Sequence, residues 1–449
     1  MTLTSGRQTL SKLDVISLVI GSVIGWGAFY LPGNKFLPEA GVLNTAVAFL
    51  LGAVLIYFIQ MGYHVMIEHH HERGGEFSYV FVHLGRGHGF LVGWALTFCY
   101  LTLIPLNATA VVLVLKQLFG GISFGYLYTA ASYPVYITDV LISTVVILVF
   151  YWVNLQGVSL SMRLQKILII SLVVIVVVSC IYMLVSGNRV QFTASYLEQS
   201  QIDGVAILKV LAIIPFLFVG FDIVPQVLTD LGFPFRFATR MTILATIIGM
   251  LIYNMLNVIT ALAYSPTQAS QLDWALGSAI SEHAGWVGFV GLCLALFAAV
   301  VGGINGFLVG SSRVLASLAT HRLLPAYFAE ENQYEIPVNA LRFVTVVSIL
   351  MPFLGRSVIS YIVDLSSLMA AVTYAYVCYV SSRLTERRIM KYQSLLGMLV
   401  GIVFVLLLVF PNSPSQLSLY SFGILGIWVG LGFLYFHFAK NKQNKKEFL

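Results

Sequence analysis

Charged residues are scarce in this chain. Only 9% of its 449 residues are Asp, Glu, Lys or Arg, whereas a typical soluble domain contains about 25%. The 24 basic and 18 acidic residues are too few to cover the surface of a water-soluble protein of this length. This scarcity excludes an ordinary soluble domain and makes lipid the main solvent of the chain.

Cysteine and periodic glycine are also lacking. The chain has four cysteines, and its 38 glycines and 13 prolines show no period, which excludes a disulfide-stapled scaffold and a collagen-like fibre. We find no haem motif and no phosphate-binding glycine loop, so we expect no cofactor. The cysteines all lie within apolar runs, where we expect them to be small packing residues: Cys99, Cys180, Cys293 and Cys378.

Long apolar runs dominate what is present. The chain is 59% hydrophobic, with a mean hydropathy of +0.91. A helix needs about 20 apolar residues to cross a hydrocarbon core of about 30 Å, and the polar gaps are too short for a soluble domain. We therefore predict a single all-α membrane domain over residues 1–449. Hydropathy predicts twelve transmembrane helices, at roughly 14–35, 42–67, 89–117, 135–153, 164–186, 205–229, 239–264, 285–318, 337–354, 358–382, 392–411 and 416–439.

The distribution of Lys and Arg predicts the orientation. With the N-terminus inside, 19 of the 24 basic residues fall on the cytoplasmic side, as the positive-inside rule requires. The other five fall outside: Lys35, Lys116, Arg189, Lys209 and Arg356. We therefore expect a multi-pass protein of the plasma (inner) membrane with both termini cytoplasmic and the basic tail 440–449 at an anionic leaflet. Because headgroup contact explains the net charge of +6, we expect no nucleic-acid partner.

Two of the predicted spans contain residues that interrupt helices. Span one carries three glycines within 21–27 and a Pro-Gly pair at 32–33, and span six carries two prolines and a glycine within 215–225. Because these spans are five apart, the second group of five enters the membrane in the opposite sense to the first. This arrangement predicts an inverted repeat with broken helices 1 and 6. The repeats would be residues 14–186 and 205–382, followed by two extra helices at 392–439.

Broken membrane helices favour a binding site. Unwound peptide groups in lipid are costly unless they line a cavity or bind a ligand. Half-helix N-termini attract anions and half-helix C-termini attract cations, so two such breaks suit a zwitterion such as an α-amino acid. Two simpler alternatives remain: Gly21 and Gly25 have the spacing of close helix packing, and a single proline is often only a kink.

Four motifs occur together and in a recognisable order. Residues 21–29 read GSVIGWGAF, and residues 216–222 read FLFVGFD. Residues 74–94 contain GGEFSY followed by GFLVGW, and residues 312–337 contain Ser-Arg, Leu-Leu-Pro and Ile-Pro. As a set, with matches from residue 21 to about 383, they resemble the amino acid–polyamine–organocation (APC) superfamily of transporters.

The resemblance implies a five-plus-five inverted-repeat core with two additional C-terminal helices, which moves amino acids or related amines by alternating access. It implies that backbone in span one receives the substrate carboxylate, that carbonyls in span six face the ammonium, and that Phe216 covers the substrate. Phe216 and Phe221 also suit ordinary packing. The implied substrate-binding residues are Gly21, Ser22, Gly25, Trp26, Gly27, Phe216, Val219, Gly220, Phe221 and Asp222.

The chain departs from the family pattern in three places. Trp26 replaces a small residue, which would narrow the pocket or place an aromatic face beside a cation. Proton-linked members often carry a lysine in span five, where this chain has Ser171, with Lys166 nearer the cytoplasm. Ser311 and Ser312 are weak candidates for Na⁺ ligands, although membrane hydroxyls more often bond their own helix. Coupling to H⁺ or Na⁺ therefore stays open.

Ionisable residues near the spans were the remaining candidates for function. Asp222 would either cap the break in span six or accept a positive group of the substrate. Asp14 and Lys12 would either pair at an inner gate or anchor the span in water. The run 68–72 (EHHHE) points around a helix rather than to one face, so we expect no metal site there.

These observations favour a secondary active transporter of amino acids or related small amines, working as an antiporter or symporter. The alternative is a membrane receptor or sensor that binds such a ligand without moving it. We expect no enzyme, because no catalytic constellation lies within the spans. The expected partners are the small-molecule substrate and the lipid bilayer, and the oligomeric state is left open.

Overall fold

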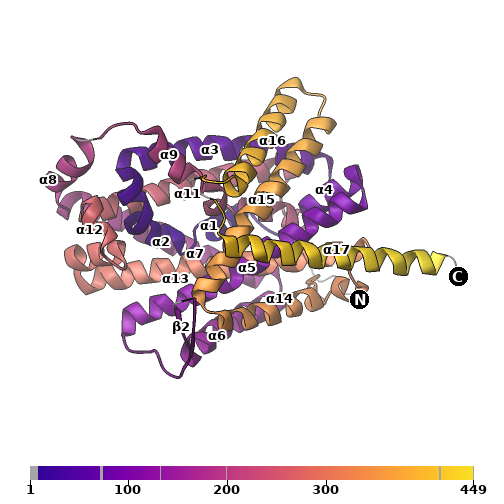
Figure 1. Cartoon of the computed structure of the whole chain (residues 1–449), viewed down its shortest axis with the longest axis horizontal. Helices are drawn as coiled ribbons and strands as arrows, with labels where there is room; N and C mark the ends of the chain where they lie inside the picture. Colours follow the sequence, from indigo (N-terminus) through magenta and orange to yellow (C-terminus); the bar gives the residue numbers. More distant parts are fainter. Residues whose placement is uncertain (1–8, 71–73, 132, 199, 414–415, 448–449) are drawn as a thin grey trace, which may run out of the picture.

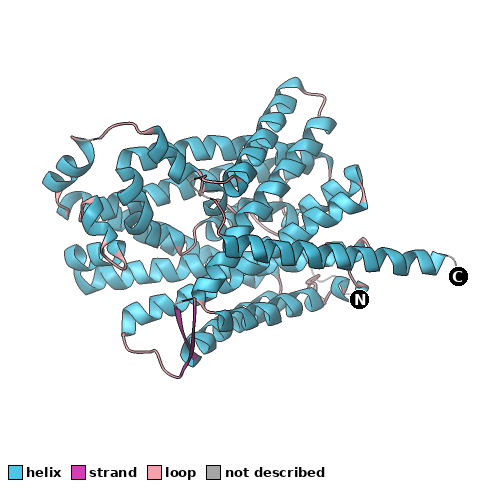
Figure 2. Ribbon diagram, viewed as in Figure 1, coloured by secondary structure: helices cyan, strands magenta, loops and turns pink. Residues whose placement is uncertain are grey.

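The computed structural model describes residues 9–70, 74–131, 133–198, 200–413 and 416–447, which are nearly all helical (Figure 2). The principal helices are α1 (Lys12–Val23), α2 (Gly27–Leu31), α3 (Leu37–His69), α4 (Gly75–Leu84), α5 (Arg86–Phe119), α6 (Ile137–Leu155), α7 (Val158–Ser186), α9 (Gly204–Leu211), α10 (Ile214–Leu217), α11 (Ala238–Ala261), α13 (Ala275–Thr320), α14 (Val338–Leu350), α15 (Arg356–Leu384), α16 (Arg388–Val409) and α17 (Leu419–Glu447). The short helices are η1 (Pro32–Phe36), α8 (Arg189–Phe192), η2 (Thr193–Leu197), η3 (Phe221–Asp230), η4 (Phe235–Phe237), α12 (Pro266–Ser270), η5 (Ala326–Ala329) and η6 (Met351–Leu354).

The described helices indicate a multi-pass membrane protein. Nine of them are long and apolar enough to cross a bilayer, and a tenth crossing results if Gly204–Leu211 and Ile214–Asp230, bent by 43°, count as one span. The sequence predicted twelve. The difference arises partly because α1 has only 12 residues, and because Gly27–His69 forms one helical run that merges parts of two predicted spans. This run bends at Gly41, where φ is +65°.

The helices α5 and α13 form the centre of the bundle. In the most apolar stretch of α5 89% of the residues are buried, compared with 11% in α17 and 28% in α7. The short α1 is enclosed because it packs against α7, α11 and α13. In Figure 1, α16 (orange) projects from the top of the bundle, and α17 (yellow) crosses its front and extends beyond it towards the C-terminus. A lipid-facing surface on α7, α16 and α17 explains why their sequences are apolar on nearly every side.

A hairpin absent from the sequence prediction joins α5 to α6. Strands β1 (Tyr126–Ala130) and β2 (Tyr133–Tyr136) pair antiparallel, with Tyr126 opposite Tyr136 and Ala130 opposite Tyr133. The hairpin packs against η6, which precedes α15, since the Tyr128 hydroxyl donates to the Phe353 carbonyl. This hairpin was not predicted from the sequence, because the apolar runs on either side are longer and more hydrophobic than its alternating aromatic residues.

The first helix is fixed at its N-terminal end. The Ser11 hydroxyl accepts the Asp14 amide at 3.3 Å, and Asp14 accepts the Ser11 amide at 2.8 Å. Asp14 also pairs with Lys166 of α7 at 2.9 Å. Of the two arrangements considered for Lys12 and Asp14, the pair between them is not formed, because Asp14 faces α7 while the Lys12 ammonium lies 4.5 Å from the centre of the Phe237 ring. Side chains of the predicted tail anchor, 440–449, lie outside the described part of the structure.

Candidate functional site

The first predicted break is present. Helix α1 ends at Val23 and α2 begins at Gly27, and Ile24 between them is extended, with φ −93° and ψ 100°. Among the described residues, the amides of Gly25, Trp26 and Gly27 donate no hydrogen bond to a backbone carbonyl. Three amide groups are thus left at the start of a helix, which is the arrangement that attracts an anion.

The second predicted break lies between α10 and η3. Residues 218–220 leave the helix, and Gly220 has φ +126°, a conformation that favours glycine. The Asp222 carboxylate accepts the Gly220 amide at 2.7 Å. The Val219 carbonyl accepts no backbone hydrogen bond from a described residue. The carboxylate therefore caps the break from one side, while the unpaired Val219 carbonyl offers an acceptor on the other.

The two breaks touch each other. A side-chain carbon at Gly220 would overlap the Ser22 side chain and lie 2.8 Å from the Ser22 carbonyl carbon. The Tyr253 hydroxyl of α11 donates to the Val23 carbonyl at 3.3 Å, which satisfies part of the open end of α1. The interrupted segments are thus held together inside the protein rather than in contact with lipid.

A buried cavity lies beside both breaks. It is narrow, with a volume of about 30 Å³, and its surface is predominantly apolar. Its lining consists of Ser22, Val23, Gly25, Trp26, Gly27, Leu103, Leu106, Asn107, Phe216, Leu217, Val219, Tyr253 and Phe307. Six of the ten predicted binding residues are among them: Ser22, Gly25, Trp26, Gly27, Phe216 and Val219.

The other four predicted residues lie behind the cavity wall. Gly21 faces the side-chain amide of Gln165, and a side-chain carbon at this position would overlap that amide unless Gln165 moved. Phe221 packs edge-on against Tyr63, with ring centres 5.5 Å apart, and is 1% exposed. Gly220 and Asp222 shape the second break without lining the space. These four residues support the site, and none of them is in its lining.

Asn107 of α5 is the main lining residue that sequence reasoning missed. Its side-chain nitrogen donates to the Leu103 carbonyl at 2.9 Å. Its side-chain oxygen is buried and has no partner among the described residues, and it faces Gly25. A buried acceptor without a donor is unfavourable, so a ligand N–H would stabilise it. The available signal was an asparagine in the interior of the apolar run 89–117.

A network of buried amides lies between the first helix and α13. The Asn305 side-chain oxygen accepts from Asn154 of α6 at 2.9 Å and from Ser161 of α7 at 2.8 Å. Its nitrogen donates to Gln165 at 3.1 Å. Gln165 in turn donates to the carbonyls of Ser17 and Gly302, each at 3.3 Å. This network joins α6, α7 and α13 to α1 through neutral groups only.

The serines considered for Na⁺ bond their own helix. The Ser311 hydroxyl donates to the Phe307 carbonyl at 2.5 Å, and the Ser312 hydroxyl donates to the Val309 carbonyl at 3.1 Å. Across the described ranges, no group of three His, Cys, Asp or Glu side chains is placed to hold a metal. Residues 71 and 72 of the histidine-rich run lie outside those ranges.

Comparison with known proteins gives consistent matches over nearly the whole length. A model of a family described as amino acid permease matches residues 10–434. The chain is 23% identical to the branched-chain amino acid permease BcaP of Lactococcus lactis subsp. cremoris, over 98% of this chain and 96% of that protein. It is 24% identical to the vacuolar cationic amino acid transporter 4 of Arabidopsis thaliana, over 82% of this chain and 62% of that protein. It is 23% identical to the Asc-type amino acid transporter 1 of Mus musculus, over 83% of this chain and 68% of that protein. None of these matches supports a receptor.

Proposed function

The chain belongs to the amino acid permease family, and from this we propose that it is a secondary active transporter that moves amino acids, or closely related small amines, across the plasma membrane. The observation that carries the proposal is the buried cavity formed where two interrupted helices meet. Relatives named as amino acid permeases and transporters support the same substrate class.

In this proposal the two ends of the substrate bind different breaks. The carboxylate accepts hydrogen bonds from the amides of Gly25, Trp26 and Gly27, whose helix start favours negative charge. The ammonium donates to the Val219 carbonyl and to the side-chain oxygen of Asn107. Each of these groups lacks a backbone or side-chain partner among the described residues, so a zwitterion would satisfy all of them at once.

We also propose the finer architecture. Twelve segments cross the membrane, residues 14–186 and 205–382 form two inverted halves, and 392–439 adds two spans. Both termini are cytoplasmic. Transport then proceeds by alternating access, in which the halves rock around a fixed site. The Leu10 amide, just before α1, donates to the Asp230 carbonyl at 2.7 Å, and the Arg313 guanidinium pairs with the Asp230 carboxylate at 2.5 Å. In this proposal these contacts break when the halves move.

We propose that transport does not require Na⁺. The two carbonyls that Gln165 bridges, at Ser17 and Gly302, are already occupied by a neutral donor, and the hydroxyls of Ser311 and Ser312 are engaged within their own helix. We expect the initial rate of uptake into proteoliposomes to change less than about twofold when choline replaces Na⁺. A rate that rises steeply with Na⁺ concentration would show that this assignment is wrong.

A panel of substrates tests the main proposal. A bound ligand raises stability by RT ln(1 + [L]/Kd), or about 2.7 kcal/mol at a hundredfold excess over Kd. We expect at least one amino acid or amine to raise the melting temperature of the purified protein and to accumulate, as a radiolabelled compound, in proteoliposomes that contain it. Empty liposomes are the control. Stabilisation without uptake would favour a receptor, and neither effect for any compound would exclude the substrate class.

A further inference from the structure

One arginine lies buried against the outer wall of the cavity. Arg356 is the first residue of α15 and is only 8% exposed. One of its terminal nitrogens donates to the Leu106 carbonyl at 3.0 Å and to the Thr109 hydroxyl at 2.8 Å. The centre of its guanidinium lies 4.6 Å from the centre of the Trp26 ring. Because Leu106 and Trp26 both line the cavity, Arg356 contacts the cavity wall at two points.

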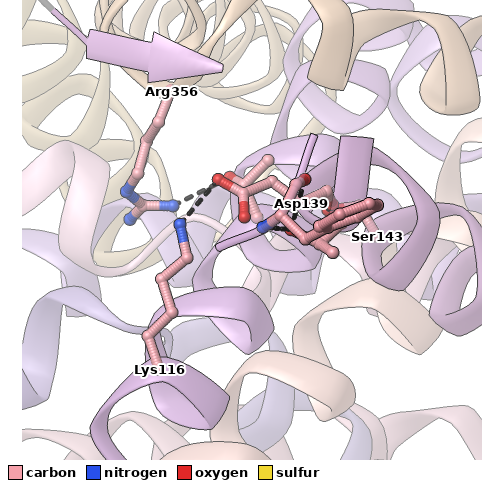
Figure 3. Close-up of polar contacts among 7 residues, drawn as sticks. Lys116, Asp139, Ser143 and Arg356 are labelled. Atoms are coloured by element: carbon pink, nitrogen blue, oxygen red, sulfur yellow. Dashed lines mark hydrogen bonds and ion pairs between the residues drawn. The ribbon is translucent and has the colours of Figure 1, made fainter. Parts of the chain in front are cut away.

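This positive charge is not neutralised by a carboxylate. In the described part of the chain Arg356 forms no ion pair, and its second terminal nitrogen is buried without a hydrogen-bond partner. Figure 3 shows Lys116 and Asp139 nearby, but Asp139 pairs through one carboxylate oxygen with the Lys116 ammonium, at 2.8 Å, and forms no ion pair with Arg356. An unpaired buried charge destabilises a protein, so folding alone gives no reason to place an arginine here.

The remaining contacts hold Arg356 in position. The Trp26 ring is flanked by Tyr30, at 5.7 Å between ring centres, and Tyr30 stacks on Trp274 at 5.4 Å. Gly355 packs against Val135 of the hairpin. The guanidinium therefore lies in a confined, poorly hydrated place, where its charge acts strongly on nearby groups.

We propose that Arg356 determines substrate specificity by fixing a positive charge at the cavity wall, so that amino acids with a cationic side chain and polyamines are rejected while neutral or acidic amino acids are accepted. The inference rests on the proposed function, since it assumes that the cavity binds an amino acid. Repulsion between like charges in a weakly screened site supplies the discrimination. The chain would thus differ in substrate class from its relatives named as cationic amino acid transporters.

Competition experiments on the whole protein in proteoliposomes test this proposal. The tracer is a neutral amino acid that the protein takes up, and the competitors are leucine, glutamate, lysine and putrescine. For the wild type, we expect lysine and putrescine to inhibit at least about tenfold less well than the best neutral or acidic compound. For Arg356→Gln, which keeps a donor for Leu106 and Thr109, we expect this ratio to fall by about tenfold or more. Arg356→Lys should retain the wild-type ratio.

Arg189→Gln is the matched control, because Arg189 is exposed and donates at 2.6 Å to the Leu184 carbonyl in the last turn of α7, away from the cavity. It should leave all ratios unchanged. A wild type that prefers lysine to leucine overturns the proposal whether or not a variant folds, as does an active Arg356→Gln protein with an unaltered ratio. In both cases the proposed function stands. If the wild type takes up no amino acid or amine, the proposed function itself fails.

Discussion

Substituting valine for Gly25 is expected to lower the rate of substrate uptake by about a hundredfold or more, while leaving the protein folded. Gly25 lies in the first break, and its φ is not in the positive region, so a larger residue can adopt the same backbone. A Cβ atom there would lie 3.3 Å from the Asn107 side-chain oxygen, and no other atom outside its immediate neighbours comes within 4 Å. The methyl groups of valine would therefore enter the cavity and occupy the place proposed for the substrate.

Substrate uptake by proteoliposomes and the melting temperature of the purified protein together check this expectation. We expect Gly25→Ala to retain part of the activity, because it adds one side-chain carbon instead of three. Gly291→Val is a suitable control, since a Cβ atom there meets only Ile175, at 3.9 Å. A Gly25→Val protein that transports at the wild-type rate would show that the cavity is not the substrate site.

Substituting alanine for Gly220 should have a different effect, namely loss of the folded protein. Gly220 has φ +126°, a conformation that costs other residues about 1–3 kcal/mol. The added carbon would also overlap the Ser22 side chain and lie 2.8 Å from the Ser22 backbone, and such overpacking adds about 1–3 kcal/mol. Against a typical total stability of about 5–15 kcal/mol, this loss is severe.

The yield of monodisperse protein and its melting temperature measure the loss. Gly285→Ala provides the control, because Gly285 also has a positive φ, +62°, but a Cβ atom there has nothing within 4 Å. The Gly285→Ala protein should lose only the stability that the positive φ costs a residue other than glycine. If Gly220→Ala were as stable as the wild type, the close contact between the two breaks would not exist in the folded protein.

Local signals in the sequence were sufficient to locate both breaks. Helix-breaking residues within 21–27 and 215–225 mark them directly, because glycine and proline act on the backbone at their own position. Six of the ten expected residues line the cavity for this reason. Gly21, Gly220, Phe221 and Asp222 do not, since which side of an unwound segment faces the space depends on neighbouring helices rather than on the motif.

Residues brought to the site by packing were not predictable in the same way. Asn107 comes from α5, Tyr253 from α11 and Phe307 from α13, each far from the breaks in sequence. Arg356 was counted only as an extracellular charge, because position along the chain does not reveal that it turns inward. Hydropathy likewise does not register where helices break or merge, so two expected spans share the long helical run in which α2 continues towards α3.

The hairpin between α5 and α6 offers a binding surface outside the cavity through which the transporter can be restrained. Its strand β2 runs directly into α6, Ala130 and Val135 of its strands pack against Gly355, and Tyr126 on β1 is 59% exposed. An antibody fragment that binds both strands would therefore restrain Gly355, the residue before Arg356, without entering the cavity. Such a reagent would lock one conformation from the surface and provide a rigid landmark for imaging the membrane-embedded protein.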